Sequence, residues 1–110
     1  MHAGLALLAL CAGGAAQAAT LKIATLSPEG SAWMELLRVG GDEVAARTGG
    51  RVQFKFYPGG VMGDDKAVLR KIRLGQLHGA VLTSSGLVQT YNDMQLYGLP
   101  LLFESYEEVD

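Results

Sequence analysis

Two short polar segments carry the side chains that could bind a ligand in this sequence. Ser27-Pro28-Glu29-Gly30-Ser31 lies between a predicted strand and a predicted helix, and Thr83-Ser84-Ser85-Gly86 follows a later apolar run. Free N–H groups at the start of a helix favour an anion, and serine and threonine hydroxyls can donate hydrogen bonds. The two segments therefore indicate an anion-binding site, although ordinary turn residues would have the same composition.

Two further side chains could contribute to such a site. Asp64, with Asp65 beside it, stands where a helix would begin, and an aspartate there is more often a helix cap than a ligand contact. Trp33 could stack on a ligand near the start of its helix, but packing in the core is the commoner role of a tryptophan.

The composition argues against an enzyme. Outside the N-terminal segment His78 is the only imidazole and there is no cysteine, whereas acid–base and nucleophilic catalysis usually recruit His, Cys or a coupled acid pair. His78 stands where a helix is expected to turn into a strand, so we expect a junction role for it. No HxxxH pair, cysteine pair or GxxxxGK[ST] motif occurs, so no metal site, phosphate loop or other cofactor is predicted. A small hydrolase with Glu29 or Asp64 as its base is the disfavoured alternative.

The charge pattern argues against a nucleic-acid partner. The 110 residues include nine Lys and Arg and eleven Asp and Glu, which gives a net charge of -2. The basic residues are scattered one or two at a time, and no long basic stripe is available to grip phosphates.

The first 18 residues are typical of a secretory signal. Residues 3–12 are almost wholly Ala and Leu, and the small-residue run after them ends in Ala16-Gln17-Ala18. An apolar run of about ten residues is shorter than the roughly 20 of a membrane-spanning helix, and the A-x-A pattern suits a signal peptidase. We predict cleavage after Ala18 and an exported chain that does not span the membrane. The alternatives are a buried N-terminal helix and a lipoprotein acylated at Cys11, which the bulky Leu10 disfavours.

Alternating strands and helices are expected to position the polar segments. The hydrophobic pattern predicts strands over 21–25, 51–57 and 79–82, the last buried on both faces. It predicts helices over 31–48 and from the aspartate cap to residue 75, and Gly40-Gly41 indicates either a close packing contact or a break in the first of them. Residues 87–95 are expected to form a helical turn or two, and 94–103 an irregular stretch with room for a short strand. This order predicts an α/β fold of βαβαβ type with a mostly parallel sheet, in which ligands bind beyond the carboxyl ends of the strands.

Short motifs in a specific order give the sequence a family resemblance. They are Pro28-Glu29-Gly30-Ser31 with Trp33, Thr48-Gly49-Gly50-Arg51-Val52, Tyr57-Pro58-Gly59-Gly60, Met62-Gly63-Asp64-Asp65, Ile72-Arg73-Leu74-Gly75-Gln76-Leu77, and Gly98-Leu99-Pro100-Leu101-Leu102-Phe103 before Tyr106-Glu107. The set resembles the periplasmic substrate-binding proteins of TRAP (tripartite ATP-independent periplasmic) transporters, of the dicarboxylate-binding, DctP-like type. The resemblance implies a type II periplasmic-binding-protein-like fold. Such a protein captures an organic acid between two α/β lobes and delivers it to a membrane permease driven by an ion gradient.

The resemblance also implies that this chain is an N-terminal piece, because family members have roughly 300 residues, as two domains of ordinary size would. Residues 19–110 would form a partial first lobe that carries one wall of the cleft, comprising Ser27, Glu29, Ser31, Trp33, Asp64, Thr83, Ser84 and Ser85. The arginine that clamps the ligand carboxylate would belong to the second lobe. We therefore expect negligible carboxylate affinity, marginal stability and exposed apolar surface for the isolated chain. A small exported protein-interaction module is the alternative.

Overall fold

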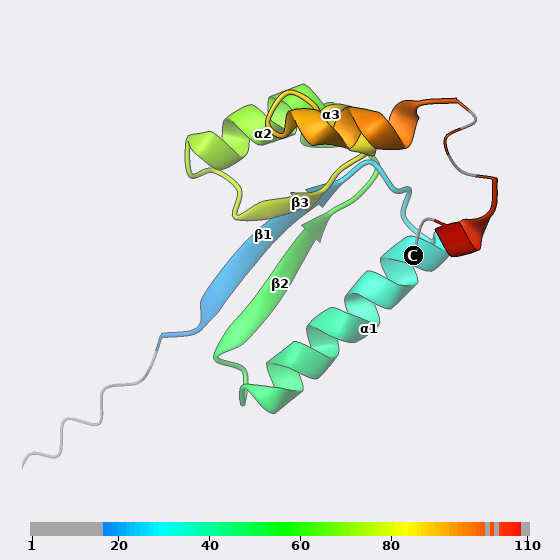
Figure 1. Ribbon diagram of the computed structural model, residues 1–110. Helices are drawn as coiled ribbons and strands as arrows, with labels where there is room; N and C mark the ends of the chain where they lie inside the picture. The colour runs from blue at the N-terminus through cyan, green and yellow to red at the C-terminus, as the bar shows by residue number, and fades with distance from the viewer. Residues whose placement is uncertain (1–16, 101, 103, 109–110) are drawn as a thin grey trace, which may run out of the picture.

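A single parallel sheet organises the chain. The computed structural model describes residues 17–100, 102 and 104–108, so the predicted signal lies outside the described residues apart from its last two. The elements are β1 (Ala19–Thr25), α1 (Ala32–Arg47), β2 (Val52–Tyr57), α2 (Asp65–Arg73), β3 (Gly79–Val81), α3 (Ser84–Leu87) and two 3-10 helices, η1 (Asn92–Gly98) and η2 (Tyr106–Glu108). The strands pair in the order β2-β1-β3, all parallel. The predicted α/β fold is confirmed (Figure 1).

Helices α1 and α2 cover opposite faces of the sheet (Figure 1). Successive side chains of a strand point to opposite faces: in β1, Ile23 lines a groove with α1 residues, whereas Ala24 packs with Val68 of α2 and with Leu77. The chain crosses from β1 to β2 and then back past β1 to β3, and right-handed crossovers in opposite directions place their helices on opposite faces. The carboxyl ends of β1 and β3 therefore meet at the point where the strand order reverses.

Both long helices begin at the residues that their sequences predict, and α2 ends at Arg73, two residues before the predicted end. Ser31 caps α1, its Oγ accepting the Met34 N–H at 3.4 Å, and α1 ends at the C-cap Thr48. Asp64 caps α2, its Oδ1 accepting the Ala67 N–H at 2.8 Å. The first helix is unbroken, and a Cβ on Gly41 would lie 3.2 Å from the Phe56 ring. Gly41 thus permits the close approach of α1 to β2. Of the two alternatives predicted for Gly40-Gly41, a close packing contact is the one observed, and a break in the helix is not.

The buried core is small. Among the described residues, the buried apolar side chains are Ala24, Met34, Val68 and Leu77, and the buried polar one is Thr25. Trp33, for which packing in the core was expected, is 70% exposed, so that prediction is wrong. The next residue, Met34, is buried instead, because neighbouring positions of a helix point about 100° apart.

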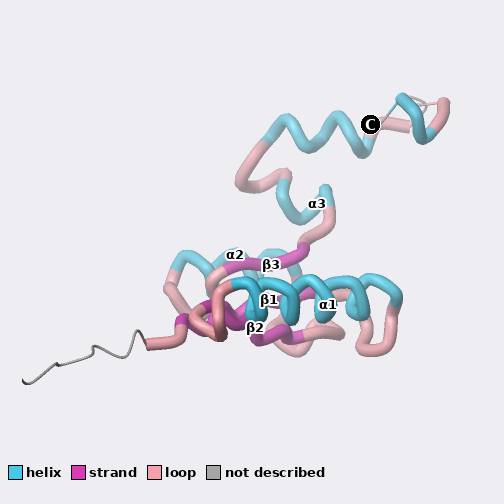
Figure 2. Tube along the Cα trace, turned by 90° about the horizontal axis from the view of Figure 1, so that it is seen from below, coloured by secondary structure: helices cyan, strands magenta, loops and turns pink. Residues whose placement is uncertain are grey.

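The third strand and the segment after it also differ from expectation. Val81 is 39% exposed, so β3 is not buried on both faces: α2 packs on it, whereas α1 packs on β2. Thr83, expected in a loop, is the N-cap of the short helix α3. Helix η1 occupies much of the 94–103 stretch, in which the sequence analysis allowed a short strand. Figure 2 shows that η1 and η2 lie away from the sheet. No helix among the described residues is both long and apolar enough to cross a membrane.

Candidate functional site

The loop after β1 is fixed at the carboxyl end of the sheet by hydrogen bonds to the loop after β2. Gly59 N donates to Ser27 O at 2.8 Å, and Gly60 N donates to Thr25 O at 3.1 Å. The hydroxyl oxygen of buried Thr25 accepts the Ser27 N–H at 3.1 Å. The backbone at Ser27 is therefore held in place at the edge where the sequence predicts a ligand site.

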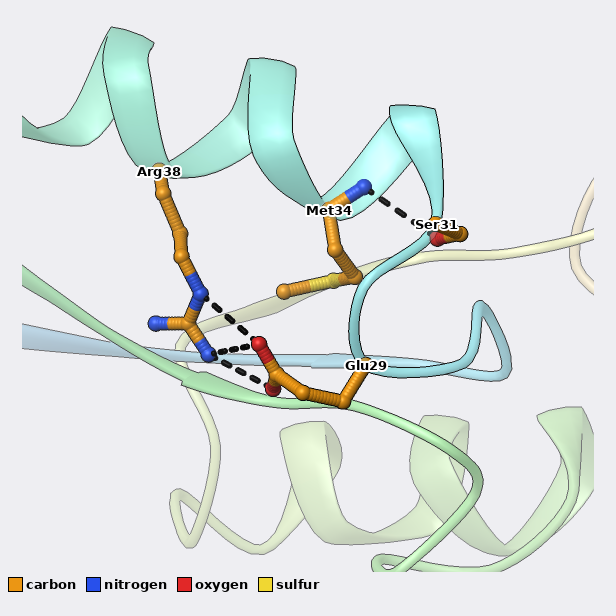
Figure 3. A network of polar contacts seen from close by, with 4 residues as sticks. All are labelled: Glu29, Ser31, Met34 and Arg38. Atoms are coloured by element: carbon orange, nitrogen blue, oxygen red, sulfur yellow. Dashed lines mark hydrogen bonds and ion pairs between the residues drawn. The ribbon is translucent and has the colours of Figure 1, made fainter.

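Glu29 is engaged by an arginine that the sequence analysis did not select (Figure 3). Arg38 Nη2 donates to both Glu29 carboxylate oxygens, at 2.8 and 2.7 Å, and its Nε donates to Oε1 at 3.1 Å. The hydrogen bonds and charge of this carboxylate raise the pKa of Arg38 above its usual value. Both side chains are about half exposed. A bidentate pair occupies the carboxylate, so Glu29 acts here as a tie between the loop and the second turn of α1.

Ser31 and Trp33 lie at the start of α1 with different surroundings. The Ser31 hydroxyl oxygen is used as the helix cap (Figure 3). Trp33 borders an apolar groove of about 490 Å³ between α1 and the sheet, whose other walls include Leu36, Phe54 and Phe56. Adjacent glycines on α1 also line this groove, and their missing side chains help to leave it open. The structure therefore places Trp33 at a groove on the α1 face of the sheet.

The loop after β3 is tied to α2 by an aspartate next to the predicted one. Asp65 Oδ2 accepts hydrogen bonds from Thr83 N, at 3.3 Å, and from the Thr83 hydroxyl. Thr83 Oγ1 in turn accepts the Gly86 N–H at 3.1 Å and lies 2.9 Å from Ser85 Oγ. Ser84 is exposed. Sequence reasoning treated Asp65 only as part of a cap, and the one available signal was its place in an Asp-Asp pair.

Asp64 lies beside a basic cavity on the outer side of α2. The cavity has a volume of about 340 Å³, and its lining includes Asp64, Lys66, Arg70, Arg73 and Gln89. The three basic residues are spaced at i, i+4 and i+7 and therefore share one helix face. Arg73 Nη2 donates a long hydrogen bond, 3.5 Å, to Thr90 Oγ1. The sequence places Arg70 and Arg73 in the last turns of this helix, but it did not predict that they line a cavity with Lys66.

His78 has the junction role that its position predicts. Its backbone N–H donates to Lys22 O at 2.9 Å, and its Nδ1 accepts the Lys22 N–H at 3.0 Å. The ring thereby ties the start of β3 to β1. Within the described part of the chain, no three His, Cys, Asp or Glu side chains are grouped in a way that could hold a metal ion.

The comparisons with known proteins agree on one family. The model of the DctP family, bacterial extracellular solute-binding protein family 7, matches residues 23–110. No curated protein matches the chain. Among solved structures, a TRAP periplasmic solute-binding protein from Ochrobactrum anthropi is 28% identical with a TM-score of 0.77, over 86% of this chain and 30% of that one.

Two further solved structures carry ligands. A TRAP periplasmic solute-binding protein from Citrobacter koseri with bound D-glucuronate is 22% identical, with a TM-score of 0.74 over 83% of this chain and 30% of that one. One from Sulfurospirillum deleyianum with bound succinate is 21% identical, with a TM-score of 0.73 over 82% of this chain and 29% of that one. The chain thus spans about 30% of the length of these proteins. Their similarity confirms the fold, and the family match shows that the chain belongs to the bacterial extracellular solute-binding proteins of family 7, which are binding proteins and not enzymes.

Proposed function

We propose that this chain supplies one wall of the ligand cleft in the extracytoplasmic solute-binding subunit of a TRAP transporter. The subunit takes up a small organic acid in the periplasm and delivers it to a permease driven by an ion gradient. Cleavage of the predicted signal after Ala18 would release the chain into that compartment.

The observation that carries this proposal is the placement of the two polar loops. Strands β1 and β3 are direct neighbours in the sheet, so the loops that follow them, 26–31 and 82–83, leave the same edge side by side. This edge is the switch point at which open α/β sheets bind ligands. The first loop also leads into α1, whose N-terminal partial positive charge favours an anion.

The proposed contact residues divide into two groups by their present partners. The first group, Ser27, Ser31 and the 83–85 segment, lies at the edge itself. The N–H groups of Ser27, Ser31 and Thr83 are already bonded within the protein, so this group offers a ligand the hydroxyls of Ser27, Ser31 and Ser84, beside the free N–H groups in the first turn of α1. Glu29, Asp64 and Trp33 belong to the wall in a supporting role, because Glu29 is held by Arg38, Asp64 caps α2, and Trp33 borders the groove. These assignments rest on position within the fold.

The ligand class follows from the same wall and from the neighbours. Relatives of this fold hold D-glucuronate and succinate, and a carboxylate would suit the N–H and hydroxyl donors here. None of the proposed wall residues is an arginine, and Arg38, beside the first loop, is paired with Glu29. A bidentate clamp on the carboxylate must therefore come from elsewhere, and the wall alone should bind weakly.

Titration of the ¹⁵N-labelled chain with D-glucuronate and with succinate tests this function by nuclear magnetic resonance. We expect small amide shifts at 27–34 and 83–86 with a dissociation constant in the range of about 1 mM or weaker, since only one side of the ligand is contacted. D-Glucose, which has no carboxylate, is the control and should leave these amides unmoved. Shifts confined to other regions, no shift at all, or a micromolar dissociation constant would contradict the proposal.

A second function, protein interaction, is favoured by the apolar groove on α1. Its lining includes Trp33 and Leu36, which are 70% and 67% exposed, and large exposed apolar patches mark interaction sites. The expected result for this alternative is a stable, monodisperse dimer in light scattering after size-exclusion chromatography, which Trp33→Ser with Leu36→Ser converts to monomer. A wild-type monomer, or a dimer that survives the double substitution, would exclude the groove as a self-association site.

A further inference from the structure

The hydroxyl protons of the loop after β3 can be assigned from its hydrogen bonds. An ionised carboxylate only accepts hydrogen bonds, whereas a hydroxyl has one proton to donate. The Thr83 hydroxyl bonded to Asp65 Oδ2 must therefore donate its proton to the carboxylate. Its oxygen is left to accept, and it does accept the Gly86 N–H.

The direction of the Ser85 hydrogen bond follows from that of Thr83. The two hydroxyl oxygens are 2.9 Å apart, and either could donate by geometry alone. Because Thr83 already donates its hydroxyl proton to Asp65, the Ser85 hydroxyl must be the donor in the hydrogen bond between the two side chains. The hydroxyl protons of Thr83 and Ser85 are thus both used in hydrogen bonds within the protein, to Asp65 and to Thr83.

Ser84 is different from its two neighbours. All three residues are exposed, but the Ser84 hydroxyl takes part in none of the side-chain hydrogen bonds that link Asp65, Thr83, Ser85 and Gly86. Its proton is therefore free for a ligand. Of three hydroxyls that look equivalent in the sequence, one is available as a donor.

The position of the loop depends on Asp65. A Cβ on Gly86 would lie 2.1 Å from Asp65 Oδ2, so the aspartate side chain lies directly against the backbone of α3. Asp65 Oδ1 is buried and has no hydrogen-bond partner among the described residues, which is unfavourable, so the hydrogen bonds that hold this carboxylate are those that Thr83 donates to Oδ2. The carboxylate therefore joins the start of α2 to the loop after β3 at a fixed distance.

We propose that Asp65 is a positioning residue that orients the 83–85 loop, and that the Ser84 hydroxyl is the side-chain donor of this loop to the ligand carboxylate. The role of Ser84 rests on the function proposed above, whereas the role of Asp65 is a property of the protein without ligand. The two parts are tested separately.

The role of Asp65 is tested without ligand through the Gly86 amide. In Asp65→Ala and in Thr83→Val, we expect its hydrogen exchange to be about five- to tenfold faster, because its acceptor is lost or misplaced. Thr83→Ser keeps the hydroxyl, so the Gly86 amide should exchange at the wild-type rate. That result would show that the faster exchange in Thr83→Val comes from the lost hydroxyl and not from a change in side-chain volume. Ser84→Ala is the matched control and should leave the rate unchanged. Unchanged exchange in Asp65→Ala and Thr83→Val would overturn the assignment.

The role of Ser84 is tested by titrating Ser84→Ala and Ser85→Ala with D-glucuronate. The initial slope of amide shift against concentration at 83–86 should fall about tenfold in Ser84→Ala, as expected when a hydrogen bond to a charged group is lost. It should stay within about twofold in Ser85→Ala, whose proton already serves Thr83. Equal losses, or a larger loss in Ser85→Ala, would overturn the role of Ser84. If wild-type protein shows no shift in either loop, the proposed function fails and Ser84 loses its role, while the Gly86 exchange still decides the role of Asp65.

Discussion

Replacement of Leu77 by alanine is expected to lower the free energy of unfolding by about 2–5 kcal/mol. Leu77 is 2% exposed and packs with Ala24 and Val68 between the sheet and α2. The substitution removes apolar contacts and leaves a cavity that the rigid strand and helix around it can fill only in part. Because the core is small, this loss is a large share of the total stability. Urea unfolding followed by circular dichroism measures the change.

Leu74→Ala is the matched control for this prediction. Leu74 is the C-cap of α2, three positions earlier, and is 65% exposed. The same chemical change there should alter the stability by no more than about 0.5 kcal/mol. Similar losses at the two positions would contradict the assignment of Leu77 to the core.

Replacement of Gly86 by alanine is expected to displace the loop after β3 and to destabilise the chain by about 1–3 kcal/mol. The added Cβ would stand 2.1 Å from Asp65 Oδ2 and 2.5 Å from Asp65 Cβ and Cγ. Rotation of the carboxylate alone cannot relieve a clash with Cβ, so the backbone of α3 must move away from α2. The hydrogen bonds from Thr83 to Asp65 should then be lost. Urea unfolding gives the loss of stability, and faster exchange of the Thr83 amide reports the displacement.

Gly98→Ala serves as the control for this prediction. A Cβ on Gly98 would have no atom within 4 Å, and Gly98, like Gly86, has a backbone that other residues can adopt. The stability should therefore be unchanged or slightly higher, since alanine reduces the freedom of the unfolded chain. If Gly86→Ala behaved like Gly98→Ala, the close contact between Asp65 and α3 would be disproved.

The pairing of Glu29 with Arg38 bears on how the proposed wall would recognise a ligand. Arg38 is the one arginine found tied to the loop after β1, and its donors are directed to the Glu29 carboxylate (Figure 3). A ligand carboxylate at this wall would therefore meet backbone N–H groups and the Ser84 hydroxyl before it met a guanidinium. Under the proposed function, this wall orients the ligand through neutral hydrogen-bond donors and supplies no guanidinium from Arg38.

The strands, the two long helices and their caps follow from local patterns in the sequence. Period-two alternation in β1 and β2 and the capping residues Ser31 and Asp64 act over a few neighbouring residues, and local preferences of this kind do not depend on the rest of the fold. The order of these elements then limited the topology to parallel βαβ units, which placed the loops after β1 and β3 at one edge. The sequence also selected the correct family through its ordered motifs, as the match over residues 23–110 shows.

Which side chains are free and which are engaged depends instead on contacts between elements far apart in the sequence. Asp65 and Thr83 are 18 positions apart, and Glu29 and Arg38 are nine apart, so neither pair leaves a local signal. The exposure of Trp33 and Val81 depends on which faces of the sheet the neighbouring helices cover. These features arise from contacts between elements, whereas periodicity and caps describe each element alone. The hydroxyls of Thr83, Ser84 and Ser85, alike in sequence, are therefore distinguished by the carboxylate that the packing of α2 brings beside them.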